Sequence, residues 1–377
     1  MSPSPLRAAW LFSPAEDLLA FLAPTLLAVA LVLLAGSVGA QQPLSPLGWL
    51  LAVVCVDVAH VWATIYRAYT VPGEVRRRPW LYLGIPAFAY GAGVALYSLS
   101  ALTFWRALAS LAVYHFVRQQ YGWIALCGRR APAARWARLD RWLDAGAVYI
   151  ATLYPIVYWH AHLPRRFHWF VPQDFFLTAP AWLESIFRVA WLLLGGLWLL
   201  RQGQRIVEER AIPAAKLLVM GSTWLSWYLG IVHYNSDFVF SLCNVLPHGV
   251  PYFVLLYRYR QSEQVERQAR PPLPAPATAS PSDAAPGRRR PPYTASAWLL
   301  FLLPLLALAF AEEGLWDRLV WHDHPMFFPL PEIFPPSWLL VLLVPLLSLP
   351  QSAHYLLDAW IWRVGPQNPD LRRRLGL

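Results

Sequence analysis

The chain has 377 residues, of which 57% are apolar and only 14% are charged, and its mean hydropathy is positive at +0.39. A soluble domain normally carries roughly 25% charged residues. This composition excludes an ordinary cytosolic enzyme, a disordered chain and a nucleic-acid-binding scaffold, because so much apolar surface cannot all be buried in a fold that faces water. The net charge of +10 does not indicate a nucleic-acid partner, since the cations lie just outside the apolar stretches.

Taken in chain order, ten apolar runs have about the length needed to cross the ~30 Å hydrocarbon core of a bilayer as helices. They cover residues 17–39, 46–66, 80–103, 107–127, 143–163, 181–200, 214–234, 238–257, 295–311 and 337–362. The sequence therefore predicts an all-α fold, a polytopic transmembrane helix bundle of about ten helices.

The cations give this bundle an orientation. With a cytoplasmic N-terminus and ten crossings, 24 of the 31 basic residues fall in the inner loops and the C-terminal tail. Because cytoplasmic loops carry the excess of Lys and Arg, we expect both the N-terminus and the C-terminus to be cytoplasmic. We expect a multi-pass integral protein of a bacterial inner (cytoplasmic) membrane.

One composition shift divides the chain. The stretch between the eighth and ninth runs is rich in Pro, Ala, Ser and Arg, a composition that buries too little apolar surface to order itself. We therefore expect an eight-helix membrane body over residues 1–260, a flexible Pro/Arg-rich cytoplasmic linker over 261–294, and a final helix pair with a basic tail over 295–377.

Ionisable side chains at membrane depth are costly and usually mark functional sites. Five histidines lie within or at the ends of the predicted helices, namely His60, His115, His233, His248 and His354. Three of them have an aspartate three or four residues away (Asp57, Asp237 and Asp358), and the pattern HYxxD occurs twice. Such spacing puts both side chains on one helical face, and a carboxylate beside a histidine is the usual partner of a metal ligand.

The heights of these histidines predict which of them meet. Counting residues to the nearest inner-side arginine, at ~1.5 Å each, places His60, His354, His248 and His115 roughly 10, 13, 15 and 21 Å from the cytoplasmic end. Four histidines from four helices thus fall in one layer. His233 lands ~26 Å up by the same count, near the outer turn.

This layer predicts a metal centre with the four histidines as ligands. A descending His233–Asp237 pair would add ligands for a second ion, and Asp57 and Asp358 would act as ligands or as catalytic groups. Imidazole with carboxylate suits iron, and also zinc, copper or manganese. No soft thiolate set competes. A buried hydrogen-bond network that fixes helix packing, a proton pathway and a pair of axial haem ligands are the alternatives.

Two further features surround the predicted layer. Arg118 shares a helical face with His115, and a membrane-buried guanidinium needs a counterion. Its partner is either Asp57 or Asp358, or the carboxylate or phosphate of a substrate. Pro247, Gly249 and Pro251 predict a break in the eighth helix, and broken backbone at membrane depth indicates a pocket.

In kind, the intramembrane histidine groups resemble those of two classes of membrane metal oxygenase. One comprises the histidine-box fatty-acid desaturases and hydroxylases, whose HxxxH and HxxHH boxes are absent here. The other comprises polytopic carotene-cleaving dioxygenases, whose iron is held by membrane histidines. The resemblance covers five short patches and assigns no ligand by position; it implies a non-haem metal and a lipophilic substrate.

The sequence thus favours a metal-dependent membrane enzyme, with non-haem iron first, that oxidises or cleaves a fatty acyl chain, isoprenoid or similar lipid. Arg118 would bind an anionic head, and an electron donor protein is an expected partner, whereas nucleic acid is not. The second hypothesis is a proton-coupled transporter that uses the same His, Asp and Arg residues as a relay.

Overall fold

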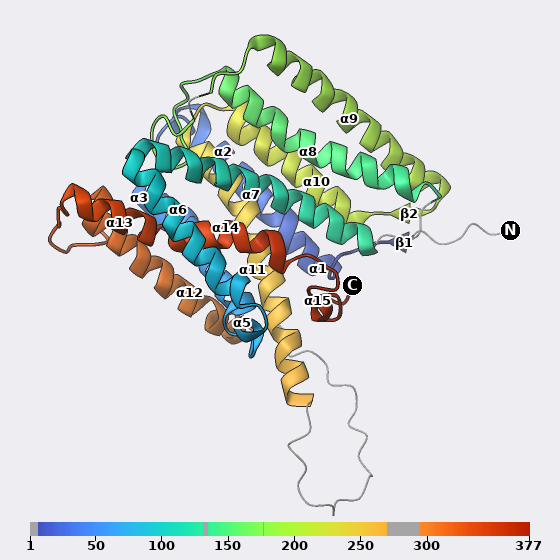
Figure 1. The fold of residues 1–377 in the computed structure, drawn as a ribbon. Helices are drawn as coiled ribbons and strands as arrows, with labels where there is room; N and C mark the ends of the chain where they lie inside the picture. Colours follow the sequence, from blue (N-terminus) through green and yellow to red (C-terminus); the bar gives the residue numbers. More distant parts are fainter. Residues whose placement is uncertain (1–6, 131–134, 176, 270–293) are drawn as a thin grey trace, which may run out of the picture.

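The computed structural model describes residues 7–130, 135–175, 177–269 and 294–377. This part of the chain is a helical bundle with one two-residue parallel pairing, Arg7–Ala8 (β1) with Ala211–Ile212 (β2). Figure 1 shows long helices layered across one another, with the C-terminal helices beside α6 and α7. The first half contains α1 (Pro14–Asp17), η1 (Leu18–Leu22), α2 (Ala23–Gly39), α3 (Pro46–Gly48), η2 (Trp49–Val58), α4 (Ala59–Ala68), α5 (Glu74–Arg77), η3 (Trp80–Gly84), α6 (Ile85–Leu99) and α7 (Ala101–Arg130). The second half contains α8 (Ala137–Ala161), α9 (Ala181–Glu208), α10 (Ala214–Trp227), η4 (Tyr228–His233), α11 (Asp237–Ala269), α12 (Ala295–Trp316), η5 (Asp317–Trp321), α13 (Ser337–Leu347), α14 (Leu349–Ile361) and α15 (Pro369–Leu375).

The all-helical prediction is confirmed, and within the described ranges each of the ten predicted runs coincides with a long helical segment. Eight of these segments are long and apolar enough to cross a membrane. The two that fall short are α7, which carries three polar residues in a row from Arg118 to Gln120, and α8, whose first turns hold Asp140 and Asp144. The protein is thus a multi-pass membrane protein by the length and composition of its helices, and the count of ten crossings stays a prediction.

Helix α11 runs through the middle of the bundle, and 89% of its most apolar window is buried. It is one continuous helix that contains Pro247 and Pro251. The break predicted at these prolines is therefore wrong. A proline removes one backbone hydrogen bond and strains the preceding turn, but neighbouring helices can hold such a helix together in a membrane protein. The same helix continues to Ala269, so residues 261–269 of the predicted linker are helical, whereas 270–293 lie outside the described residues.

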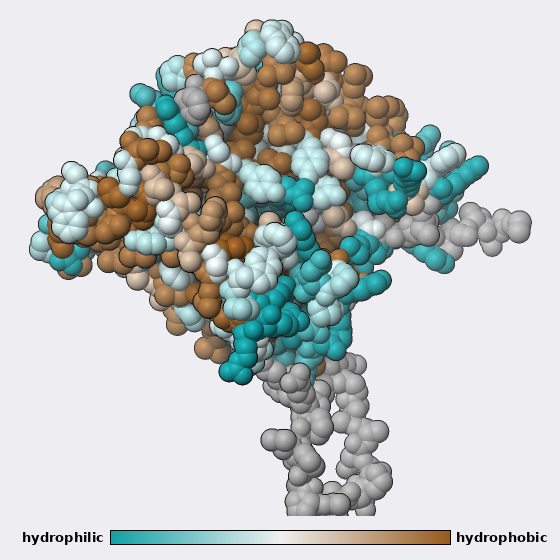
Figure 2. Space-filling view, viewed as in Figure 1, coloured by the Kyte–Doolittle hydropathy of each residue, from teal (hydrophilic) through white to brown (hydrophobic). Residues whose placement is uncertain are grey.

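Charged residues gather at one end of the molecule. Figure 2 shows hydrophilic residues along the lower and right-hand edges, where α5, α15 and the β1–β2 pair lie, and hydrophobic residues over much of the upper part. Many of the predicted inner-side cations are paired there: Arg201 with Asp140, Lys216 with Asp144, and Arg258 with Glu16. Buried pairs of this kind hold the helix ends together because neither partner is left unpaired.

Candidate metal centre

Four imidazole rings meet at the centre of the bundle. They come from His60 on α4, His115 on α7, His248 on α11 and His354 on α14, and each residue is at most 3% exposed. Around the group, successive ring centroids are 4.7 Å (60 to 248), 5.2 Å (248 to 115), 4.6 Å (115 to 354) and 5.0 Å (354 to 60) apart. The four histidines predicted to share one layer therefore lie together; we call them the histidine cluster.

The ligand atoms of the cluster fall into two overlapping groups. One nitrogen each from His60, His115 and His354 lie within 4.8 Å of one another, and so do Asp57, His60 and His248. The Nε2 atoms of His60 and His248 are 3.1 Å apart. Two nitrogens that each lie about 2.1 Å from a shared ion would be separated by about 3.0–3.4 Å, so this spacing, which also allows a hydrogen bond between the two rings, suits two ligands of one metal.

Unpartnered nitrogens are the second sign of a ligand site. His115 Nε2 and His354 Nε2 are buried and have no hydrogen-bond partner among the described residues. Buried polar atoms are nearly always satisfied, and each exception needs a cause such as a missing ion. The donor set of neutral imidazoles beside a carboxylate is one that binds iron, zinc, copper or manganese. The histidine cluster can therefore hold a metal ion.

A hydrogen-bonded chain orients His354. Its Nδ1 lies 2.6 Å from Thr64 Oγ1, which lies 3.1 Å from the hydroxyl of Tyr252, which in turn donates to Asp358 Oδ1 over 2.8 Å. If each group in this chain donates its hydrogen bond in the direction of the carboxylate, His354 donates from Nδ1 and keeps the lone pair on Nε2 for a ligand. Partners of this kind fix the tautomer and the ring orientation of metal-binding histidines.

Local sequence explains why these side chains converge. Thr64 follows His60 by four residues and Tyr252 follows His248 by four, so each pair shares one helical face. Helices α11 and η2 approach closely at Gly249, where a Cβ atom would lie 2.6 Å from Val56 Cγ1 and 3.2 Å from the Val56 carbonyl oxygen. Only a residue without a side chain fits there, and the close approach brings His248 beside His60.

The structure also places the predicted acidic and basic partners. Asp57 Oδ1 is 3.5 Å from His60 Nδ1, and Asp358 Oδ1 is 3.7 Å from His354 Nδ1, so both carboxylates flank the cluster. Arg118 pairs with neither of them in the described part of the chain. Its Nη1 donates to the hydroxyl of Tyr149, and its guanidinium lies over the ring of Tyr121, 5.0 Å from the centroid.

The structure sets the His233–Asp237 pair apart from the cluster. His233 is exposed at the end of η4, with its ring 4.7 Å from that of Tyr234. Asp237 accepts a hydrogen bond from the backbone of Leu44 over 3.1 Å. The structure therefore does not bring this pair to the histidine cluster, and neither residue belongs to the groups of possible ligand atoms found among the described residues.

Several residues near the site escaped the sequence analysis. Thr64 and Tyr252 gave no signal beyond their spacing of four from a histidine. Glu312 is 5% exposed and accepts a hydrogen bond from Trp62 Nε1 over 2.6 Å. It lies just past the predicted end of the ninth run, whereas the helical segment continues to Trp321; the acidic pair of Glu312 and Glu313 ended the apolar run without ending the helix.

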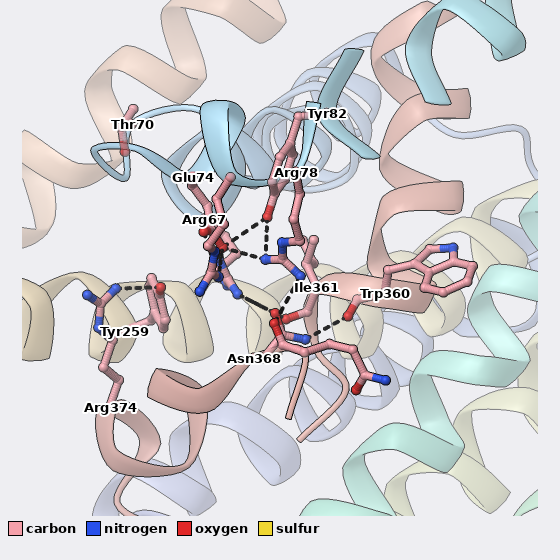
Figure 3. A network of polar contacts seen from close by, with 12 residues as sticks. Arg67, Thr70, Glu74, Arg78, Tyr82, Tyr259, Trp360, Ile361, Asn368 and Arg374 are labelled. Carbon is pink, nitrogen blue, oxygen red and sulfur yellow. Dashed lines mark hydrogen bonds and ion pairs between the residues drawn. The ribbon is translucent and has the colours of Figure 1, made fainter. Parts of the chain in front are cut away.

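A polar network ties together the two helices that hold Thr64 and His354 (Figure 3). Arg67, at the end of α4, donates to Glu74 over 3.1 Å and to the side chain of Asn368 over 2.9 Å. The amide of Asn368 donates in turn to the carbonyl oxygens of Trp360 and Arg363 at the end of α14, both over 2.9 Å. We call Arg67, Glu74 and Asn368 the arginine clamp.

Glu74 is ionised in the clamp. Burial by itself would raise its pKa, but hydrogen bonds and charge from Arg67, with hydrogen bonds from Arg77 and Arg78, lower the pKa to about 2. The clamp joins the last turn of α4 to the end of α14, the two helices that carry Thr64 and His354, and it contributes no ligand to the cluster.

Two cavities reach the cluster from different sides. The first, of about 270 Å³, touches Thr64 and His354 and is otherwise mostly apolar, with Val61, Ile65, Leu346 and Leu357 among its lining residues. The second, of about 480 Å³, extends from His115, Tyr252 and Asp358 to Arg118, Arg129 and Arg363. Both sizes suit part or all of a small ligand.

Comparison with known proteins identifies no relative of this chain: no protein-family model, no curated protein and no solved structure matches it.

Proposed function

We propose that the protein is a metal-dependent membrane enzyme whose histidine cluster binds a transition metal, iron in the first place, and which oxidises or cleaves a lipophilic substrate. The observation that carries this proposal is the convergence of four buried imidazoles from four helices, with nitrogens that have no partner among the described residues. A purely structural network would be expected to satisfy those nitrogens from within.

The chemistry divides between the ion and the chain. A bound transition metal would supply Lewis acidity and, in the case of iron, redox chemistry with dioxygen as the co-substrate. The chain would orient His354 through Thr64, Tyr252 and Asp358, and would exclude water from the cluster. The mostly apolar cavity beside His354 supports sideways entry of a lipophilic substrate or of dioxygen. A monooxygenation would also need an electron donor protein.

Metal analysis is the direct test. Protein purified in detergent and reconstituted with Fe²⁺, Zn²⁺ or Cu⁺ should retain about one or two equivalents of its preferred ion. His60→Ala, His115→Ala, His248→Ala and His354→Ala should each lose most of it, while the exposed His233→Ala serves as the matched control. A visible spectrum distinguishes haem from a non-haem centre. Retention of less than a tenth of an equivalent of every metal tried would overturn the proposal.

A proton-coupled transporter is a second candidate, and one observation favours it. Glu312, Glu313 and Asp317 follow one another along α12 and η5, and Glu312 accepts a hydrogen bond from Trp62, two residues after His60, so carboxylates continue away from the cluster. A relay of this kind would carry protons without any metal. Proton flux in proteoliposomes that resists chelators and is abolished by Glu313→Gln would select this function, and metal-dependent turnover without flux would reject it.

A further inference from the structure

The larger cavity differs from the smaller one in its charge. Its buried end is formed by His115 and Tyr252, which are 3% and 1% exposed. Its other lining residues include Arg118, Arg129 and Arg363, all exposed. The cavity thus joins the histidine cluster to a cationic opening.

The three arginines at this opening have no acidic partner among the described residues. Arg129 donates to the carbonyl oxygen of Val364 over 3.5 Å, and Arg363 lies over the ring of Trp360, 4.7 Å from the centroid. Within the described ranges, no carboxylate forms an ion pair with either of them or with Arg118. By contrast, the clamp and the charged end of the bundle pair Arg67, Arg201, Arg205, Arg258 and Arg374 with acids.

Asp358 also lines the cavity, but it does not neutralise this opening. Its side chain is 8% exposed, and Tyr252 donates a hydrogen bond to it beside His354. The positive charge therefore stays available to a ligand. Guanidinium groups are well suited to it because their planar donors match carboxylate and phosphate oxygens.

We infer that this cavity binds a long-chain amphiphile with a single anionic head, a carboxylate or a phosphate, at Arg129 and Arg363, and that its tail points toward the histidine cluster. Arg118 follows His115 by only three residues, about 4.5 Å along α7, so it lies beside the tail and not at the head. The reach fits such a molecule. Arg363 follows His354 by nine residues and Arg129 follows His115 by fourteen, which correspond to about 13 and 21 Å along their helices. One leaflet of a bilayer offers a hydrocarbon depth of about 15 Å, so a membrane acyl chain is long enough to reach from Arg363 to the level of His354.

This inference deepens the proposed function, since it rests on that proposal for what the cluster does to the tail. Binding of the head needs no metal, however. The experiment therefore uses metal-stripped protein in nanodiscs of neutral phosphatidylcholine and measures equilibrium binding of three radiolabelled probes: oleate, oleyl phosphate and oleyl alcohol. Failure of metal binding would leave this measurement intact, and failure of head binding would leave the metal analysis intact.

We expect at least one anionic probe to bind tenfold or more tightly than the alcohol, and its binding to weaken in 1 M NaCl. The ranking of oleate and oleyl phosphate tells which head the site takes. The double variant Arg129→Gln/Arg363→Gln should bind the anion no better than the alcohol. Arg130→Gln is the control, because Arg130 is exposed at the same helix end but does not line the cavity. Equal binding of all three probes, or no loss in the double variant, would overturn the inference.

Discussion

The histidine cluster and the arginine clamp are two buried polar groups that lie about two turns apart along α4. They differ in whether their polar atoms find partners within the protein. In the arginine clamp, both terminal nitrogens of Arg67 and both side-chain functions of Asn368 find partners within the protein; only Nε of Arg67 is left over. In the histidine cluster, each of the four rings has one buried nitrogen without a hydrogen-bond partner in the described part of the chain, although that of His60 lies 3.5 Å from Asp57. Because unpaired buried polar atoms are costly, the clamp is complete as a structural network, whereas the cluster needs a ligand such as a metal ion to satisfy its nitrogens.

The largest effect should come from breaking the clamp. Arg67→Met removes the cation that joins Glu74 to Asn368, and removing one partner of a buried pair costs about 3–5 kcal/mol. We expect Arg67→Met to lower the free energy of unfolding by about 3 kcal/mol, the lower end of this range, because Arg77 and Arg78 still pair with Glu74. Unfolding in detergent micelles measures it.

The exposed Arg76→Met is the matched control for that variant and should unfold like the wild type. The comparison adds a second readout: folded Arg67→Met protein should still bind metal, whereas His248→Ala should lose metal and keep most of its stability in the metal-free state. If both variants lost both properties equally, the two groups would be one unit, and the contrast between them would fail.

The second prediction concerns the contact between Gly249 and Val56, which brings His248 beside His60. Gly249→Ala puts a methyl group 2.6 Å from Val56 Cγ1, and overpacking of this kind costs about 1–3 kcal/mol. Unfolding free energy and bound metal should both fall. Gly221→Ala, where a Cβ would meet nothing within 4 Å, should be neutral or stabilising. Gly249→Ala combined with Val56→Ala should recover part of both properties, because the carbonyl oxygen of residue 56 would still lie 3.2 Å from the new Cβ; a failure to recover any of the loss would show that space at this contact is not what matters.

A smaller effect is expected from breaking the hydrogen-bonded chain that orients His354. Thr64→Val keeps the shape but removes the hydroxyl between His354 and Tyr252, and loss of such an outer partner lowers metal affinity about 10- to 100-fold. We expect a loss near tenfold in competition titrations against a chelator. The control is Thr152→Val, because Thr152 is equally buried but bonds only to backbone oxygens of its own helix. Unchanged affinity in Thr64→Val would place the hydroxyl outside the site.

Some features of the fold and of the site could be predicted from the sequence and others could not, for physical reasons. The helices and the meeting of His60, His115, His248 and His354 were predictable, because bilayer thickness fixes helix length and the rise per residue fixes height. The unbroken helix at Pro247 was not predictable, because it depends on neighbours that the sequence does not place.

The outer partners of the cluster were hidden for a different reason. Thr64 and Tyr252 are common residue types in membrane helices, and only their contacts across helices give them a role. The heights also could not exclude His233, because tilt changes depth without changing the sequence. Arg118 was expected to pair with an aspartate or with the carboxylate or phosphate of a substrate; its ring and hydroxyl partners in the structure, Tyr121 and Tyr149, come from its own helix and the next.

The smallest effect is the acid response of the clamp. Since the pKa of Glu74 is lowered to about 2 from an ordinary value of 4.5, its ionised form stabilises the fold fully above pH 4.5, and this contribution is lost as the pH falls toward 2. The gap in Tm between the wild type and Glu74→Gln should therefore be constant near neutral pH and narrow progressively below about pH 4.5. Asp370→Asn, at an exposed carboxylate paired on the surface, should show little gap at any pH, as expected for a solvent-screened pair. A gap for Glu74→Gln that stayed the same at pH 3 would mean that the clamp is held by shape rather than by charge, and the difference between a self-satisfied network and an unsatisfied cluster would then lie only in the histidines.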